Sequence, residues 1–349
     1  LIFLRVPIGL AMLLGGLVGL TIVSGDTTLA FARLKSETFT TFSSYSLSII
    51  PMFLLMGHFA TLGGMSQALF KAAESWIGHR KGGVAMSAIG ACAGFGAICG
   101  SSLATAATMG QVALPELKRY GYPGSLSTGA LAAGGTLGIL IPPSVILVIY
   151  AILAEQNIEK LFVAALIPGI LAALGYVLAI SIWVRVSPNS AAVKPRVPWG
   201  ERMVALLSVW PVLTIFLLVV GGIYLGVFTP TEAAAVGAAG TGVAALASGQ
   251  MSWAKLVQAI LATASASAMI YLIILGAGFY NNFLALTQLP QTASVWVAEQ
   301  GFSPWLVLAA VLVMYLVFGC IMDSLSIWDT KVGRAPLLQN PSFGEMPSG

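Results

Sequence analysis

The sequence predicts an all-α polytopic membrane protein, and two observations support this fold class. Hydrophobic residues make up 58% of the chain and charged residues only 8%, whereas a soluble domain carries roughly 25% charged residues. Long apolar runs recur along the chain, and about 20 apolar residues in a helix span the bilayer core. This composition makes the lipid bilayer an expected partner. The net charge of +4 is small and dispersed, which gives no support to nucleic-acid binding.

The expected membrane elements follow from these apolar runs. They are residues 2–23, 47–70, 82–119, 125–153, 161–184, 203–227, 231–247, 256–286 and 305–322. A polar linker with three prolines, 186–202, separates the fifth and sixth. Because short loops rich in Lys and Arg stay in the cytoplasm, Lys194, Arg196 and Arg202 place this linker there.

The segment 125–153 is expected to be one helix broken at residues 141–144. Its sequence there is Ile-Pro-Pro-Ser. Proline lacks the N–H group that the preceding turn needs, and the residue before a proline avoids the helical region. Pro142 and Pro143 would therefore free carbonyls at the end of one half-helix, and Ser144 would begin the next.

The segment 82–119 contains a cluster of small residues, from Gly94 to Ser102, inside an apolar run. We interpret it as a re-entrant hairpin whose tip lies near residues 97–102, with both ends in the cytoplasm. Two ordinary spans are the alternative, but 38 residues are fewer than the roughly 40 that two spans need before any turn. A hairpin tip would meet the proline break in mid-membrane, where irregular backbone survives only inside protein or beside a cavity.

The tip and the break together form the candidate substrate and ion site. Free carbonyls suit a hard cation, and a helix N-terminus suits an anion. The Ser101 and Ser102 hydroxyls are candidate Na⁺ ligands because hard cations prefer oxygen. The other candidates in this half of the chain are small or helix-breaking residues around the two interruptions: Gly96, Gly100, Thr136, Gly138, Pro142, Pro143 and Ser144.

Each candidate also has a structural interpretation. Gly96 and Gly100 could serve only close helix packing, as small residues do in membranes. Thr136 could face the hairpin tip or bond to its own helix backbone, and Ser144 could simply cap the second half-helix. Glu232 is expected to be a helix N-terminal carboxylate rather than a ligand.

A weak internal repeat has an offset of 223 residues. Pro7 matches Pro230 and Gly96 matches Gly319 at this offset. An ionisable group at membrane depth is usually functional, so the repeat makes Asp323 and Ser324 candidates for a second ion site. Asp323 at the water interface is the alternative. Five membrane elements separate equivalent points, counting the hairpin as one that does not cross, and we expect the remaining crossings to place the second hairpin on the opposite side, as in inverted-repeat transporters that bind substrate between broken helices.

The repeat also suggests an organisation into parts. We expect scaffold helices of repeat 1 (1–75), a transport part with the hairpin and broken helix (76–185), the cytoplasmic linker (186–202), scaffold helices of repeat 2 (203–290), the first arm of a second hairpin (291–327) and a polar tail (328–349). Relative to the repeat, one helix is missing at the start and about three elements at the end, so we expect a chain truncated at both ends, with an incomplete second repeat.

These blocks resemble the large membrane subunit of tripartite ATP-independent periplasmic (TRAP) transporters. The resemblance rests on 96–102, Pro115-Glu116, 138–144, Phe228-Thr229-Pro230-Thr231-Glu232 and 319–324. It implies a sodium-coupled elevator-type importer in the bacterial or archaeal inner membrane, working with a small membrane subunit and a periplasmic binding protein. The implied substrates are small organic acids of the C4-dicarboxylate, keto acid or sialic acid class. The expected ion is the coupling ion Na⁺, with no other cofactor.

Other functions are less well supported by the residues. No phosphate-binding GxxxxGK[ST] loop and no hydrolase or metalloprotease motif occurs in the sequence, so we expect a transporter driven by an ion gradient and not an enzyme. A related permease or antiporter without a binding protein, a nonfunctional truncated copy and a noncatalytic assembly component are the alternatives.

Overall fold

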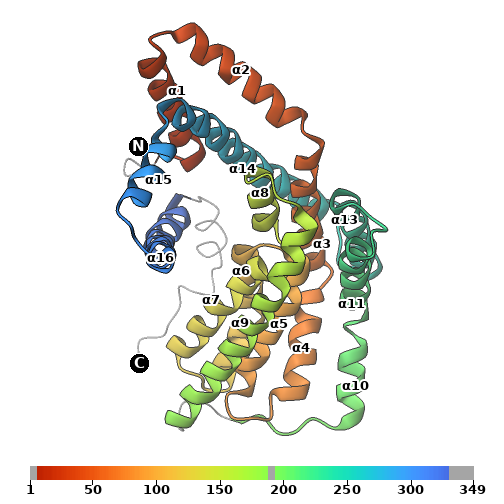
Figure 1. Ribbon diagram of the computed structural model, residues 1–349. Helices are drawn as coiled ribbons and strands as arrows, with labels where there is room; N and C mark the ends of the chain where they lie inside the picture. Colours follow the sequence, from red (N-terminus) through yellow and green to blue (C-terminus); the bar gives the residue numbers. More distant parts are fainter. Residues whose placement is uncertain (1–5, 188–192, 330–349) are drawn as a thin grey trace, which may run out of the picture. The chain divides into compact units, whose positions relative to one another are not determined.

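The computed structural model describes residues 6–187 and 193–329, and every regular element in these ranges is helical (Figure 1). At residues 315 and 318–329 the backbone alone is described. The elements are α1 (Ile8–Ser24), α2 (Thr27–Ser43), η2 (Tyr45–Ser48), α3 (Ile49–Leu62), α4 (Met65–Ile77), α5 (Gly83–Cys99), α6 (Ser102–Arg119), α7 (Gly124–Leu140), α8 (Val145–Leu153), α9 (Ile158–Val186), α10 (Trp199–Leu207), α11 (Trp210–Phe216), η4 (Leu217–Gly221), α12 (Gly222–Tyr224), α13 (Pro230–Ala247), α14 (Trp253–Thr287), α15 (Leu289–Glu299) and α16 (Pro304–Asp329).

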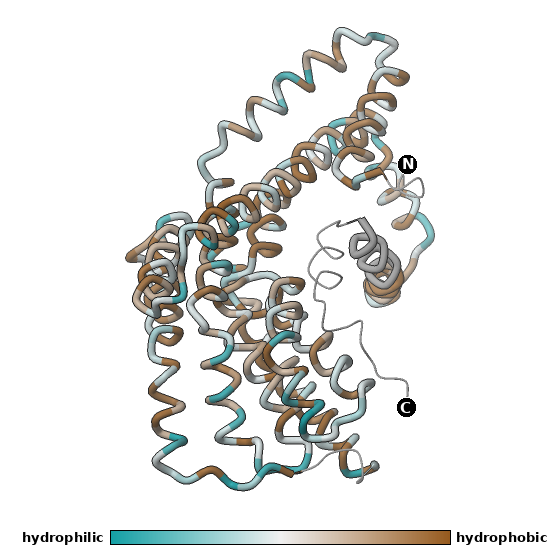
Figure 2. The backbone as a smooth tube through the Cα atoms, turned by 180° about the vertical axis from the view of Figure 1, so that it is seen from behind, coloured by the Kyte–Doolittle hydropathy of each residue, from teal (hydrophilic) through white to brown (hydrophobic). Residues whose placement is uncertain are grey.

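Several helices have the length and apolarity of membrane spans. Within the described ranges three qualify alone, namely Tyr45–Leu62, α9 and α14, and two bent helix pairs raise the number to five if each pair is one span. Figure 2 shows these helices as mostly hydrophobic, with hydrophilic residues in the chain that leads into α10. The all-α polytopic membrane fold predicted from the sequence is therefore confirmed.

The chain forms two compact units. One contains α3 to α13 within residues 41–271, and the other combines the described residues up to 40 with those from 272 onward. The first unit holds both the hairpin and the broken helix. It joins elements that the sequence interpretation divided between scaffold and transport parts, because α4 packs on α5 and α3 packs on α13. The scaffold and transport roles themselves stay predictions.

The hairpin and the broken helix form one packed group in the first unit. Helix α7 lies against both arms of the hairpin, α5 and α6 (Figure 1). Side chains on α5 are almost all buried, including Phe95 and Ile98. Burial of such side chains drives folding in the aqueous parts of a protein, but within a membrane close packing of small residues does so. The small residues of α5 and α7 therefore explain why these helices approach closely.

Two expected spans are interrupted in ways that the hydropathy pattern did not reveal. Residues 47–70 are divided into α3 and α4 because Gly63 follows the end of α3, and Gly64, at φ +70°, has a left-handed conformation that redirects the chain into α4. Residues 203–227 divide into α10 and a second helical stretch, with a bend of 43°. Pro211 at the start of that stretch explains the bend, since it cannot donate to the preceding turn.

Two helices, α2 and α15, were not expected from the sequence. The residues of α2 are a mixture of polar and apolar side chains, and those of α15 include Pro290 in the first turn. Neither gives a long apolar run, so a search for membrane spans passes over both. The expected role of Glu232 is confirmed: its carboxylate accepts from Thr229 N at 2.8 Å, and Thr229 Oγ1 accepts from Glu232 N at 3.3 Å, forming a reciprocal cap on α13.

The internal repeat has a counterpart in the packing of each unit. In the unit with the chain ends, a Cβ added at Gly19 of α1 would lie 2.6 Å from the ring of Phe283 on α14. In the other unit, a Cβ at Gly242 of α13 would lie 3.2 Å from the ring of Phe59 on α3. The two glycines are 223 residues apart and the two phenylalanines 224. A glycine–phenylalanine joint thus occurs in each unit; its glycines match the 223-residue offset, and its phenylalanines are one residue out of register with it.

Candidate functional site

The hairpin turns at Gly100 and Ser101, as the sequence predicted. Gly100 ends α5 with φ +63°, a conformation that favours glycine. Ser101 is extended, and its hydroxyl accepts a hydrogen bond from Ala104 N at 3.4 Å. The turn therefore needs one glycine to reverse the chain and one serine to begin α6.

The predicted break in 125–153 is also present. Helix α7 ends at Leu140, α8 begins at Val145, and the two are bent by 46°. Carbonyls of Gly138 and Ile139 lose their helical donors because Pro142 and Pro143 have no N–H group. Ser144 is fully buried, and its hydroxyl accepts from Leu147 N at 3.4 Å, so the expected capping role is confirmed.

The hairpin tip and the break are in direct contact. Val145 N, the first donor of α8, bonds to Gly100 O at 3.1 Å. A Cβ added at Gly100 would lie 2.9 Å from Pro143 O. The two irregular backbone segments therefore satisfy each other inside the protein, which is what polar main chain at membrane depth requires.

Glycines let the helices cross at this point. A Cβ at Gly96 on α5 would lie 2.7 Å from the Cα of Gly138 on α7. A Cβ at Gly138 would lie 2.7 Å from Thr105 Oγ1 and 2.9 Å from Ser101 O. The close-packing interpretation of Gly96 is thus correct, and it places Thr105 and Ser101 beside the same glycine.

Thr105 is the residue that the sequence interpretation missed. It is fully buried on α6, and its hydroxyl makes no well-formed hydrogen bond among the described residues, although the weakly hydrogen-bonding Cys99 thiol lies beside it. A buried polar group without a partner is costly and calls for an explanation. Its position four residues after Ser101, on the same face of the helix, is the signal that could have identified it.

The electrostatics of the crossing follow from the helix ends that meet there. The N-termini of α6 and α8 each contribute a partial positive charge, and the C-termini of α5 and α7 contribute carbonyls with partial negative charge. Gly96, Gly100, Pro142 and Pro143 are buried, whereas Ser101 and Ser102 are half-buried. Both anion-binding and cation-binding groups therefore gather within this one crossing.

Thr136 does not face the hairpin tip. It is exposed, its hydroxyl donates to Ala133 O of its own helix at 2.7 Å, and it lies 3.0 Å from the Tyr176 hydroxyl on α9. The expectation that it points toward the tip is wrong, because one face of α7 presents Gly135 and Gly138 to α6 while Thr136 points elsewhere. The alternative, a bond to its own backbone, is correct.

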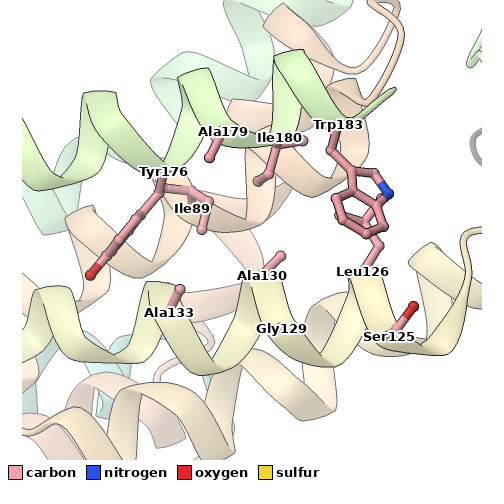
Figure 3. A pocket seen from close by; sticks show the side chains of 10 residues that line it. All are labelled: Ile89, Ser125, Leu126, Gly129, Ala130, Ala133, Tyr176, Ala179, Ile180 and Trp183. Atoms are coloured by element: carbon pink, nitrogen blue, oxygen red, sulfur yellow. The ribbon is translucent and has the colours of Figure 1, made fainter. Parts of the chain in front are cut away.

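A separate cavity of about 250 Å³ lies among α5, α7 and α9. Figure 3 shows Tyr176, Ile180 and Trp183 of α9 facing Ala130, Ala133 and Leu126 of α7. Its lining is almost wholly apolar, so it offers little to hold a carboxylate or a cation. The polar crossing, not this cavity, is the candidate site.

The candidates of the second half are not described in the same detail. Asp323 and Ser324 lie in the helical backbone of α16, but their side chains lie outside the described residues. Their expected role in a second ion site stays a prediction.

Comparison with known proteins decides the family. A family model described as "Tripartite ATP-independent periplasmic transporter, DctM component" matches residues 1–328. The chain belongs to this family. As a member, it is a multi-pass inner-membrane transport protein rather than an enzyme, and it is the large permease component of a tripartite type of transporter.

Individual relatives agree with this assignment. The permease is 38% identical to the C4-dicarboxylate TRAP transporter large permease protein DctM of Pseudomonas aeruginosa over 296 residues, which cover 84% of this chain and 69% of the relative. It is 31% identical to the DctM protein of Rhodobacter capsulatus, covering 92% and 75% of the two chains. The permease is also 29% identical to the sialic acid TRAP transporter permease protein SiaT of Haemophilus influenzae, over 94% of this chain and 52% of the relative.

Proposed function

We propose that this permease imports small organic acids of the C4-dicarboxylate class, driven by a sodium gradient. The observation that supports it most is the hydrogen bond from Val145 N to Gly100 O, which brings two helix N-termini and two sets of freed carbonyls together. Helix N-termini favour a substrate carboxylate, and the carbonyls favour a cation. The names of two relatives that match most of this chain at 38% and 31% identity support the dicarboxylate class over the keto acid or sialic acid class.

Sodium would bind beside Gly138 in this proposal. Thr105 Oγ1 and the Ser101 carbonyl oxygen lie close to Gly138. The hydroxyl groups of Ser101 and Ser102 belong to the same turn as that carbonyl. Oxygen ligands of this kind suit a hard cation. The carboxylate would lie at the N-termini of α6 and α8, with Ser144 and Pro143 on its α8 side.

Thr105→Val is expected to weaken sodium binding about tenfold or more while leaving the sodium-free protein equally stable. Valine keeps the shape of threonine and removes a hydroxyl whose neighbour is the weakly hydrogen-bonding Cys99 thiol, so little internal hydrogen bonding is lost. The measurement is the thermal unfolding temperature of the purified chain, titrated with NaCl against KCl at constant ionic strength.

Thr128→Val is the matched control. Thr128 is exposed on α7, and its hydroxyl bonds only within its own helix, to Gly124 O and Ser125 O. Its sodium titration should equal that of the unmodified chain. A Thr105→Val curve that coincides with the control would remove Thr105 from the site, and equal unfolding temperatures in NaCl and KCl would contradict sodium coupling.

We further propose that a small membrane subunit and a periplasmic binding protein work with this permease, and that the hairpin and broken helix move together in an elevator cycle. Uptake of radiolabelled succinate into proteoliposomes, with and without these partners and with and without a sodium gradient, tests the partnership. Uptake that needs only the permease would favour the alternative of a permease without a binding protein. Absence of uptake with every partner present would favour a nonfunctional copy.

A further inference from the structure

The segment from 193 to 202 is held against the ends of two earlier helices. Lys194 Nζ lies 2.9 Å from Glu74 Oε2 on α4 and 5.7 Å from the centre of the Tyr120 ring, just after α6. The Trp199 ring packs edge-on against Trp76 of α4 at 5.9 Å. This second half of the linker is therefore part of the folded unit and not a free connection.

Donors without acceptors gather where the linker meets α4. Arg202 is 3% exposed; its Nε donates to Val197 O at 2.9 Å, but its Nη2 has no partner among the described residues. The indole Nε1 of Trp76 is likewise buried and unpartnered, and the nearby His79 ring is hydrogen-bonded to the backbone at Trp76 with its Nδ1 left without a partner among the described residues. Arg202 and Trp76 both lie against the Trp199 ring, with the guanidinium carbon 5.3 Å from the ring centre.

The charges around these donors are predominantly positive. Burial, and then the charges of Arg196, Arg202 and Arg80, lower the pKa of His79. The Oε2 of Glu74 is already paired with Lys194, its Oε1 is buried without a partner among the described residues, and Glu201 is exposed to solvent. Buried donors in a positive field lack the anion that would satisfy them.

We propose that Arg202, Trp76 and Arg196 form a binding site for a phosphate-type oxyanion beside His79, which we name the linker anion site. The Arg202 guanidinium and the Trp76 indole N–H donate to the anion's oxygens, and Arg196 adds charge at the exposed edge. Inorganic phosphate and the phosphodiester headgroup of an anionic phospholipid share this chemistry. The site is distinct from the crossing of α5 to α8 and does not depend on the transported substrate.

Thermal unfolding of the purified full chain tests the proposal. One arm titrates sodium phosphate against sodium chloride at equal sodium concentration and ionic strength. The other adds short-chain phosphatidylglycerol against phosphatidylcholine with the same acyl chains. If phosphate and phosphatidylglycerol both raise the unfolding temperature, the site binds free phosphate as well as a lipid headgroup. If phosphatidylglycerol alone raises it, the ligand is the lipid headgroup.

Trp76→Phe is the most specific variant, because it removes the N–H and keeps a ring against Trp199. It should weaken binding of the stabilising anion about tenfold, beyond the loss of stability that the smaller ring causes in the anion-free chain. Arg196→Gln changes an exposed side chain and should weaken anion binding several-fold. This variant remains informative if another variant does not fold. Arg185→Gln, an exposed arginine at the end of α9, is the matched control and should leave the titration unchanged.

Two results would overturn the linker anion site. One is an unfolding temperature that neither phosphate nor phosphatidylglycerol raises above its control. The other is a rise that is the same in Trp76→Phe, Arg196→Gln and Arg185→Gln, since that is general screening of basic surface charge rather than a site.

Discussion

Replacing Gly96 by valine is expected to separate α5 from α7 and abolish transport. Even the first atom of the new side chain would lie 2.7 Å from the Cα of Gly138, and backbone cannot move aside as a flexible side chain can. Overpacking of a well-packed interior costs about 1–3 kcal/mol, and a β-branched side chain against backbone should reach about 3 kcal/mol or more. The unfolding temperature of the purified permease and its uptake rate both measure the effect.

Gly110→Ala provides the control for this experiment. Gly110 lies within α6, where an added Cβ meets nothing within 4 Å. Alanine in an unhindered helical position is favoured over glycine by roughly 0.5–1 kcal/mol, so this variant should be slightly more stable and fully active. A Gly96→Val permease as stable as Gly110→Ala would show that the helices do not cross where we place them.

Lys194→Met is expected to destabilise the permease by about 3 kcal/mol. Removing one partner of a buried ion pair leaves an uncompensated charge, which costs about 3–5 kcal/mol. The lower figure applies because the Lys194 side chain is 22% exposed, although that of Glu74 is only 8% exposed. Denaturant unfolding measures the loss, and the double variant Lys194→Met/Glu74→Gln should recover much of it.

A surface ion pair supplies the comparison for Lys194. Arg119 and Glu116 are 3.7 Å apart, and the Arg119 side chain is 72% exposed. Exposed pairs of this kind contribute about 0–1 kcal/mol. Arg119→Met should therefore change stability little, and a Lys194→Met effect no larger than that would contradict the buried-pair interpretation.

The same ion pair predicts a dependence on pH. Burial lowers the pKa of Lys194, but the hydrogen bond and charge of Glu74 outweigh this and raise the pKa above its ordinary value. A raised lysine pKa stabilises the folded state fully below the unfolded value of about 10.4, and this contribution is lost as pH rises through the folded pKa. The unfolding temperature should thus fall above about pH 10.4 more steeply in the unmodified chain than in Lys194→Met.

The broken elements of the candidate site could be predicted from sequence because they depend on backbone chemistry. Two prolines cannot donate to the preceding turn, whatever surrounds them, so the break after Leu140 follows from Pro142 and Pro143 alone. The turn at Gly100 follows for a similar reason, since a glycine before a serine both ends one helix and begins the next.

Features that depend on which face of a helix meets a neighbour could not be predicted in the same way. Thr136 and Thr105 are both threonines on apolar helices, and only the packing of α7 against α6 and α9 separates them. The donors at the linker were missed because Trp76 and Arg202 are 126 residues apart in sequence. The breaks at Gly64 and Pro211 were passed over because hydropathy averaged over a window does not respond to a single residue.

The duplicated glycine–phenylalanine joint gives this protein an internal reference. Gly19 faces the ring of Phe283 and Gly242 faces the ring of Phe59 within one polypeptide, but an added Cβ would lie 2.6 Å from the first ring and 3.2 Å from the second. Alanine should therefore cost more stability at Gly19, where the ring must move aside, than at Gly242, where a small shift is enough. The ratio of the two costs measures how much freedom each unit leaves to a ring at the same kind of contact.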